Sequence, residues 1–202
     1  VMGVLLAGGQ SRRFGGGDKC LSPLAGKPML AHAIDRLAPQ AGTLILNANG
    51  DPARFAQFGL PVVPDPIDDF PGPLAGVLAG LEYAAARPGA RWIVTAATDS
   101  PMFPSDLVER LQAAVAGRTP AIALAACDGQ IHPTFGLWPT ALASDLRRAL
   151  AAGTRRIVSW TDKHDCSVVD FGKVTQGAGA YDPFFNINTR DDLQQAEALL
   201  SG

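Results

Sequence analysis

The chain has 202 residues, of which 47% are hydrophobic and 18% are charged, and it contains 22 glycines and 16 prolines. This composition is typical of a globular protein with a sizeable core and many loops, and it excludes disorder, collagen and coiled coil. Seventeen basic and 19 acidic residues give a formal charge of −2 without long runs of either sign. We therefore expect no nucleic-acid or membrane partner, and a few local donors must hold any anionic ligand.

The cysteines and the apolar start of the chain indicate the cellular compartment of the protein. Cys20, Cys127 and Cys166 are odd in number and lack CxxC spacing, so a disulfide framework is not expected. No apolar run approaches the ~20 residues that span a bilayer. The apolar start of the chain has no basic leader and continues into glycines, which is typical of a buried strand rather than a signal peptide. We expect a cytoplasmic protein.

Apolar strand-length runs alternate with amphipathic helical stretches along the chain, at roughly 20–30 residues per unit. This repetition predicts βαβ crossovers and one domain over residues 1–202, of the α/β class, with a mostly parallel sheet between two helical layers (three-layer α/β/α). The expected strands are 1–6, 43–46, 61–63, 92–97, 122–126, 135–138 and 168–171. The expected helices are 28–37, a short helix from 52 to a stop at 59, one from 76 to about 87, then 105–116, 140–152 and a last helix from 189.

Four of the predicted strands each end in a polar or glycine signal. Gly8 and Gly9 follow the first strand, Asn47 the second, Asp65 the third and Asp99 the fourth. In open parallel sheets, ligands bind at the carboxyl ends of the strands, so these residues outline a candidate site. The alternative is that they only mark the loops between elements.

The segment from Gly8 to Lys19 is rich in glycine and basic residues. Glycines let backbone N–H groups approach a phosphate, and Arg12, Arg13 and Lys19 supply positive charge to neutralise it. The segment is neither a Walker sequence nor a GxGxxG fingerprint. It is either a phosphate-binding loop or a flexible surface loop, and its positive charge in a negatively charged chain favours phosphate.

Individual side chains leave further alternatives open. Asp99 is either a Mg²⁺ ligand, because Mg²⁺ takes one or two carboxylates with phosphate and water, or a cap for the turn before Pro101. Asp65 carries the same ambiguity. Asn186 and Asn188 would point the same way in an extended segment, and they either bind a ligand or fix the next turn. His132 lacks partners at zinc spacing, so it packs a turn or contacts substrate.

Seven short motifs occur in a fixed order from Leu6 to Asn188, almost the full chain. The motifs are Leu-Ala-Gly-Gly, Arg-Arg-x-Gly-Gly-x-Asp-Lys, Asn-Ala-Asn, Pro-Gly-Pro-Leu-Ala-Gly, Asp-x-Pro, His-Pro-Thr and Asn-x-Asn. In this order they resemble the molybdenum cofactor guanylyltransferases, although Phe14 stands where that family usually has Met.

The resemblance implies a Rossmann-like nucleotidyltransferase fold and a Mg²⁺-dependent reaction. GMP from GTP would join the terminal phosphate of molybdopterin, giving a guanine dinucleotide cofactor and pyrophosphate. Lys19, Asp99 and Arg13 would carry catalysis, and Asp99 would bind Mg²⁺. The nucleotide-binding N-terminal half would contact GTP through Leu6, Ala7, Gly8, Gly9, Lys19, Asn47, Asp65 and Asp99. The C-terminal half would bind molybdopterin through Arg155, Arg156, Asn186 and Asn188.

Other functions remain as alternatives at this stage. A molybdopterin cytidylyltransferase or a sugar-phosphate nucleotidyltransferase shares the glycine-rich loop and the metal-binding aspartate, and a non-catalytic nucleotide-binding module is a third possibility. GTP and molybdopterin are the expected partners, with transient contacts to cofactor-insertion proteins or apo-molybdoenzymes. The favoured function requires Lys19 and Asp99 to meet across the same edge of the sheet.

Overall fold

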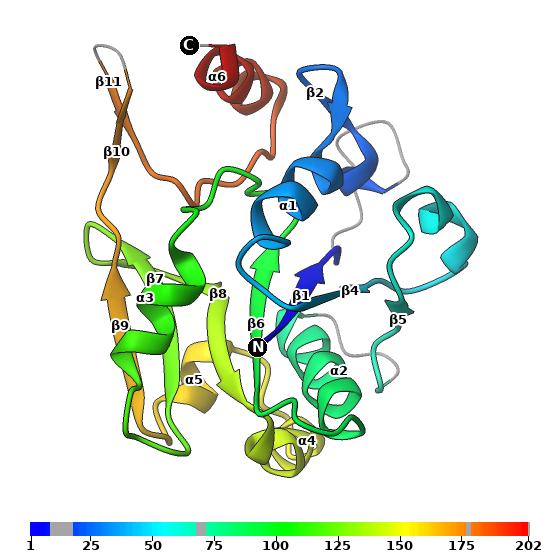
Figure 1. The fold of residues 1–202 in the computed structure, drawn as a ribbon, viewed down its shortest axis with the longest axis vertical. Helices are drawn as coiled ribbons and strands as arrows, with labels where there is room; N and C mark the ends of the chain where they lie inside the picture. Colours follow the sequence, from blue (N-terminus) through cyan, green and yellow to red (C-terminus); the bar gives the residue numbers. More distant parts are fainter. Residues whose placement is uncertain (9–17, 68–71, 177–178, 202) are drawn as a thin grey trace.

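A seven-stranded sheet runs through the middle of the computed structural model, which describes residues 1–8, 18–67, 72–176 and 179–201 (Figure 1). All its neighbouring strands pair in parallel except β8, which is antiparallel to both β6 and β7. Across the sheet the order is β5 (Val62–Val63), β4 (Thr43–Asn47), β1 (Met2–Leu6), β6 (Trp92–Ala97), β8 (Gln130–Pro139), β7 (Ile122–Cys127) and β9 (Cys166–Asp170).

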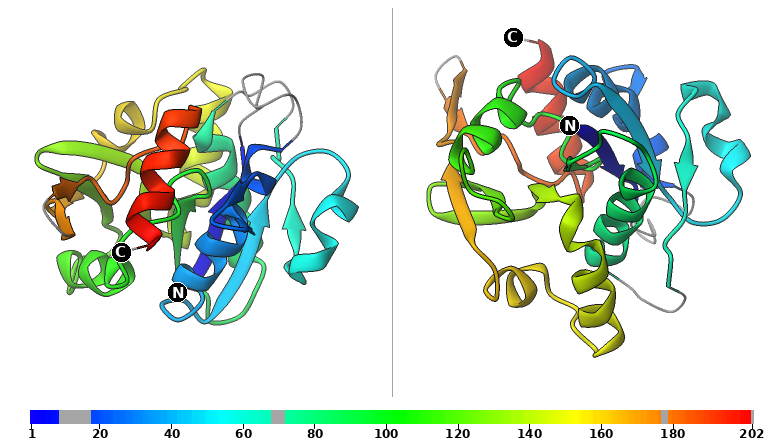
Figure 2. Two further views of the ribbon diagram at one scale, coloured as in Figure 1. Left: turned by 90° about the horizontal axis from the view of Figure 1, so that it is seen from above. Right: turned by 60° about the horizontal axis from the view of Figure 1, so that its bottom comes forward.

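Helices cover both faces of this sheet. In the view from above they form two groups on opposite sides of it (Figure 2, left). One face is packed by α1 (Met29–Leu37) and α3 (Leu107–Ala114). The other is packed by α2 (Pro73–Ala85), α4 (Ala143–Ala151) and α5 (Ile157–Thr161). The predicted three-layer α/β/α architecture with a mostly parallel sheet is therefore confirmed.

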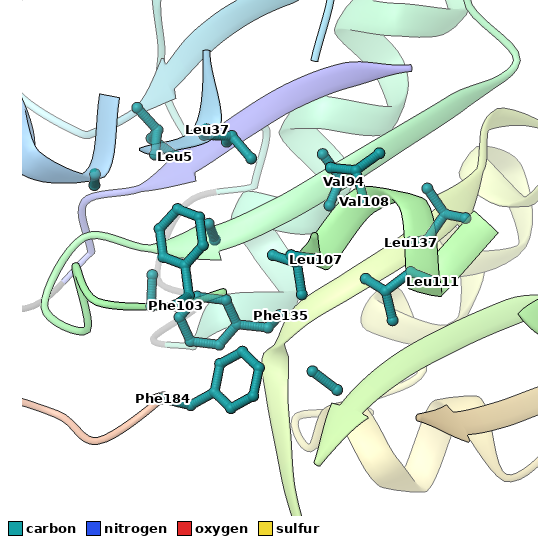
Figure 3. Packing of buried hydrophobic residues seen from close by; sticks show 14 of the residues in the cluster. Leu5, Leu37, Val94, Phe103, Leu107, Val108, Leu111, Phe135, Leu137 and Phe184 are labelled. Atoms are coloured by element: carbon teal, nitrogen blue, oxygen red, sulfur yellow. The ribbon is translucent and has the colours of Figure 1, made fainter. Parts of the chain in front are cut away.

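The alternation of side chains along the strands divides the core into two. In β1, Val4 and Leu6 face the layer of α2, whereas Leu5 faces the layer of α1 and α3. Both sides of this central strand are buried, which explains why its sequence is a continuous apolar run. On the α3 side, Phe103, Phe135 and Phe184 pack in a chain with ring centroids 5.5 and 4.9 Å apart (Figure 3).

A third, smaller cluster joins the end of the chain to the first helix. It contains Leu24, Met29 and Ile187, together with Ala196 of α6 (Arg190–Ser201). The remaining elements are short: the 3₁₀ helices η1 (Lys19–Leu21), η2 (Pro52–Phe58) and η3 (Thr140–Leu142), and the strands β2 (Pro23–Leu24), β3 (Lys27–Pro28), β10 (Val174–Gln176) and β11 (Gly179–Tyr181). Within the described ranges, no helix has the length and apolar character needed to cross a membrane.

Several predicted boundaries differ from the observed ones. The helix expected over 105–116 is α3, two residues shorter at each end, and the helix expected over 140–152 is divided into η3 and α4. The returning strand expected over 135–138 is β8, which extends back to Gln130 because its hairpin with β7 continues to the turn. The two small hairpins β2–β3 and β10–β11 were not predicted, since strands of two or three residues carry too little alternation to recognise.

A capping box stands at the start of α6. Thr189 Oγ1 accepts a hydrogen bond from Asp192 N at 3.1 Å, and Asp192 Oδ2 accepts one from Thr189 N at 2.8 Å. Thr189→Ala is expected to lower the free energy of unfolding by about 1 kcal/mol, because it leaves a helical N–H without its side-chain acceptor. Thermal denaturation measures the effect, and an unchanged midpoint would contradict this role of the cap.

Candidate active site

Lys19 and Asp99, which are 80 residues apart in sequence, meet at the carboxyl edge of the sheet. Lys19 opens η1, and Asp99 follows β6. The Lys19 Nζ atom lies 2.9 Å from Asp99 Oδ2 and donates a second hydrogen bond of 2.6 Å to Asn188 Oδ1. The two charged side chains are 12% and 28% exposed. Two oxygens from distant segments thus hold the ammonium group in place while the pair keeps access to solvent.

The carboxyl ends of the neighbouring strands β4, β1 and β6 lie at the same level of the sheet, beside this pair. Leu6 pairs with Asn47 of β4 on one side and with Ala97 of β6 on the other. Beyond the strands, Ala7 N donates to Asn47 O at 3.0 Å, and Thr98 donates to Leu6 O through both its N and Oγ1 atoms, at 3.2 and 3.1 Å. The backbone of Leu6, Ala7 and Gly8 therefore leaves the sheet between the end of β4 and the end of β6.

Asp65 is fixed by two asparagines at the neighbouring corner. Asn47 Nδ2 donates to Asp65 Oδ1 at 2.9 Å, and Asn49 Nδ2 donates to Asp65 Oδ2 at 2.7 Å. Asn49 Oδ1 in turn accepts a hydrogen bond of 2.8 Å from Asp65 N. An ionised carboxylate has about four lone-pair sites, so both oxygens can still accept hydrogen bonds from a ligand. Held in this way, Asp65 can recognise N–H or O–H groups in a defined geometry.

Helix α2 approaches the site closely because residue 76 is glycine. A Cβ atom at Gly76 would lie 2.3 Å from Asn47 Oδ1 and 2.8 Å from Leu6 Cδ2. The Pro-Gly-Pro-Leu-Ala-Gly motif therefore has a packing role in its last residue, since only glycine lets α2 lie against the Asn47 side chain.

The segment before α6 crosses the same edge. Ile187 N donates to Asp99 O at 2.8 Å, and Ser100 Oγ donates to Asn186 Oδ1. Asn188 N donates to Asp192 Oδ2 at 2.8 Å, which fixes the asparagine that contacts Lys19. Of the two asparagines predicted for molybdopterin, Asn188 thus contacts Lys19 directly, and Asn186 contacts Ser100, the residue after Asp99.

Asp192 stays ionised while it anchors this segment. Burial raises the pKa of the Asp192 carboxyl, but hydrogen bonds from Asn188 N and from Thr189 outweigh burial, and the nearby Lys19 charge adds to them, so the net pKa is lowered. A lowered folded-state pKa means that this stabilisation is present above the ordinary carboxyl pKa and is lost only as the pH falls through the lowered value.

His132, at the start of β8, lies beside the beginning of the same segment. Its Nε2 atom is 2.9 Å from Asp182 Oδ2, and its ring packs on Phe184 with centroids 5.1 Å apart. Asp182 Oδ1 also accepts a hydrogen bond from Phe184 N at 2.8 Å. Of the two predicted roles of His132, these contacts support packing and anchoring at a turn.

The cysteines are poor nucleophiles. Burial raises the pKa of Cys20 to about 12, and the neighbouring Asp18 charge adds to the effect. Burial and the Asp182 charge raise the pKa of Cys127 to about 11. Both residues are therefore thiols at neutral pH, so covalent chemistry on sulfur has no support here.

The remaining predicted residues lie elsewhere or outside the described ranges. Arg155 and Arg156 belong to the connection between α4 and α5, where Arg155 Nη1 is 3.4 Å from Thr154 O and 3.5 Å from Leu150 O. The backbone of Arg155 borders the start of α2, because its carbonyl is 3.7 Å from where a Cβ on Gly72 would lie. Gly9 and Arg13 lie outside the described residues.

Asn49 is the main site residue to which the sequence analysis assigned no role. The Asn-Ala-Asn motif held a usable signal, since residues two apart in an extended segment point to the same side. Both asparagines of the motif do bind the Asp65 carboxylate.

The donor chemistry of this edge suits Mg²⁺ bound jointly with phosphate. No cluster of three or more His, Cys, Asp or Glu side chains occurs in the part of the chain that the structure describes, so a complete protein-built metal cage is absent there. Mg²⁺ takes one or two carboxylates and completes its shell with phosphate oxygens and water. The partly exposed Asp99 carboxylate fits this requirement.

A mostly parallel open sheet with charged and amide side chains at its carboxyl edge is the arrangement in which α/β proteins bind ligands. Residues 3–166 match the model of the MobA-like NTP transferase domain, and the chain belongs to this family. It is 52% identical over 198 residues to a molybdenum cofactor guanylyltransferase of Rhodopseudomonas palustris (strain BisB5), covering 97% of this chain and 92% of the relative. It is 50% identical over 201 residues to one of Bradyrhizobium sp. (strain ORS 278), covering 98% and 92%. The resemblance in the motifs is thereby confirmed.

Solved structures share the fold at low sequence identity. Molybdopterin-guanine dinucleotide biosynthesis protein A from Archaeoglobus fulgidus superposes with a TM-score of 0.75 at 23% identity, covering 100% of this chain and 99% of that chain. The 4-diphosphocytidyl-2C-methyl-D-erythritol synthase from Anaerococcus prevotii superposes with a TM-score of 0.70 at 14% identity, covering 100% and 96%. These similarities confirm the predicted Rossmann-like nucleotidyltransferase fold.

The close packing at Gly76 gives a stability prediction. Gly76→Ala is expected to lower the free energy of unfolding by about 1–3 kcal/mol, because the added methyl must displace Asn47 and Leu6 from a packed core. Gly42→Ala is the control, since its Cβ would come no nearer than 3.9 Å to Val1 O. Chemical denaturation of both variants measures the difference, and equal stabilities would refute the packing role of Gly76.

Proposed function

We propose that this protein transfers GMP from GTP to the terminal phosphate of molybdopterin and releases pyrophosphate. The observation that carries the proposal is the contact between Lys19 Nζ and Asp99 Oδ2, 2.9 Å apart at the ligand-binding edge of the sheet. The full-length similarity to molybdenum cofactor guanylyltransferases supports the choice of GTP and molybdopterin as substrates.

The reaction needs charge stabilisation and alignment more than covalent participation. An oxygen of the molybdopterin phosphate attacks the α-phosphorus of GTP in line, the bond to the β-phosphate bridging oxygen breaks, and pyrophosphate leaves with the electron pair. Negative charge builds on the transferring and leaving oxygens. Lys19, already fixed by Asn188, would meet this charge, as would Arg13 from the basic loop. The attacking phosphate is already ionised, so no general base is required.

Asp99 is the residue that would hold Mg²⁺, together with phosphate oxygens of the substrate. The ion would supply a concentrated positive charge that polarises those oxygens. Asp99 is suited to this role because its carboxylate is partly exposed and its backbone is fixed by the bond from Ile187 N to Asp99 O.

The Asp65 corner would hold the nucleoside part of GTP. Its carboxylate is oriented by Asn47 and Asn49, so it can accept hydrogen bonds from base N–H groups or ribose hydroxyls without first paying the entropy of ordering a side chain. The backbone of Leu6, Ala7 and Gly8 lies between this corner and Lys19, where it can contact the middle of the nucleotide.

Molybdopterin would approach from the side of the C-terminal segment. Asn186 and Asn188 lie at the junction with Asp99 and Lys19, where the two reacting phosphates must meet. Arg155 and Arg156, beside the start of α2, would supply further positive charge to the acceptor.

The scattered thiols favour the cytoplasm as the place of action. The product would pass through transient contacts to proteins that insert the cofactor or to apo-molybdoenzymes.

The decisive experiment mixes the purified protein with Mg²⁺, GTP and molybdopterin, and searches for the dinucleotide by mass spectrometry. Dinucleotide and pyrophosphate are expected in equal amounts, and neither is expected when GTP is omitted. Competition among GTP, CTP and ATP tests the cytidylyl alternative. Binding of GTP without pyrophosphate release would instead support a non-catalytic nucleotide-binding module.

Replacing Asp99 tests the electrostatic part of the mechanism. Asp99→Asn is expected to lower kcat by about 10²–10³, because it removes a charge aimed at the reacting phosphates. Asp106→Asn, which alters an exposed carboxylate at the N-cap of α3 whose partner Arg110 is 3.9 Å away, is the control. Near-normal turnover of the Asp99 variant with Mg²⁺ would refute the metal-binding role.

Replacing Lys19 distinguishes ground-state binding from transition-state stabilisation. Lys19→Ala is expected to lower kcat as well as GTP affinity, because the contact strengthens as charge develops. Lys163→Ala, an exposed lysine after α5, serves as the control in steady-state kinetics. A rise in KM with unchanged kcat would show that Lys19 only binds the substrate.

A further inference from the structure

Arg54, in η2, contacts both sides of the site without belonging to the predicted ligand-binding set. Its Nη1 atom donates to Asp18 Oδ1 at 3.0 Å and lies 2.8 Å from Asp18 Oδ2. Its Nε atom donates to Asp51 O at 2.9 Å, and its Nη2 atom donates to Asn49 O at 2.5 Å. One guanidinium thus joins the residue before Lys19 to the loop that follows β4.

Each of these partners leads directly to a site side chain. Asp18 precedes Lys19, and its carbonyl accepts the hydrogen bond of 2.9 Å from Leu21 N that begins η1. Asn49 donates to the Asp65 carboxylate through Nδ2 and accepts a hydrogen bond from Asp65 N through Oδ1. Arg54 therefore connects the segment that carries Lys19 to the residue that orients Asp65.

The surroundings of Arg54 are suited to a guanidinium. Gly50 has φ +84°, and a Cβ there would lie 3.3 Å from Arg54 Nη2, so the loop wraps closely around the side chain. The guanidinium carbon also lies 5.1 Å from the centroid of the buried Phe55 ring. A planar fork with several donors can bind a carboxylate and two carbonyls together, whereas a lysine ammonium is a point charge on a flexible stem.

We propose that Arg54 is a positioning residue that sets the spacing between Lys19 and Asp65, and thereby aligns a bound nucleoside triphosphate for reaction. The inference rests on the proposed function, in which Lys19 meets the phosphates and Asp65 meets the nucleoside. A triphosphate has a limited span, so a shift of one contact relative to the other misplaces the α-phosphorus. Misplacement of this kind is costly in rate even when no contact to the substrate is deleted.

The test compares Arg54→Met, Arg54→Lys, Asp18→Ala and the Arg54→Met/Asp18→Ala double variant with the wild type. Arg147→Met is the matched control, because Arg147 makes an equally well-formed pair with Glu82, at 2.6 and 2.7 Å, that joins α4 to α2. Steady-state kinetics with GTP and molybdopterin give kcat and KM for each, and thermal denaturation gives the stability.

We expect Arg54→Met to lower kcat/KM for GTP by about tenfold or more and to keep kcat low at saturating GTP, because more substrate does not realign Lys19. Adding Asp18→Ala should cost less than twofold further, since both residues act through one link. Arg54→Lys should recover only part of the activity. Arg147→Met should lose stability to a similar extent and keep its kinetic constants within about twofold.

Amide hydrogen exchange without nucleotide tests the link independently of the reaction. Exchange in residues 18–21 and 49–51 is expected to rise in Arg54→Met and to stay at the wild-type level in Arg147→Met. Unchanged exchange there overturns the inference, as do kinetic constants equal to those of Arg147→Met or multiplicative effects in the double variant. A wild-type protein that makes no dinucleotide overturns the proposed function instead, and the exchange result still decides whether Arg54 holds the two loops together.

Discussion

The contact between Lys19 and Asp99 depends on the parallel pairing of β1 with β6. Because the register places Leu6 beside Ala97, the chain leaves both strands at the same level of the sheet, and Asp99 stands at the edge where Lys19 contacts it. A salt bridge with side chains 12% and 28% exposed contributes little to stability by itself. In the proposed reaction its importance lies in position, because a cation and a carboxylate held side by side at a strand edge would supply the charge stabilisation that phosphate transfer needs.

Around this centre, each functional group is fixed by a neighbour from another part of the chain. Asn188 holds Lys19, and Asp192 holds the backbone of Asn188. Asn47 and Asn49 hold Asp65 in the same way. Preorganisation of this kind reduces the reorganisation needed when substrate binds, which is a main source of catalytic power in enzymes that transfer phosphoryl or nucleotidyl groups. The same contacts bring the start of α6 to the site, because Asn188, two residues before the helix, contacts Lys19 and is held by Asp192 of the helix.

Much of the fold was predictable because its signals are local and repeated. Continuous apolar runs identified the buried strands, and alternation with amphipathic helices identified the parallel sheet. The long hairpin strand β8 was underestimated, since its first half is only partly buried and lacks a strong apolar pattern. The candidate site was predictable at the strand ends, where Asn47, Asp65 and Asp99 each interrupt an apolar pattern. The two-residue spacing of Asn47 and Asn49 held a signal for their shared partner, whereas Arg54 lies in the short helix η2 and bonds to Asp18, 36 residues away, which no local spacing indicates.

The sequence by itself determined the class of fold and the strand ends at which polar groups collect, because both follow from the order of apolar and polar residues along the chain. Only the tertiary structure decided which of these groups touch. Lys19 reaches Asp99 and Asn188 across separations of 80 and 169 residues. Contacts at such distances are set by strand order, register and the path of the loops, and these depend on how the whole core packs rather than on any local pattern.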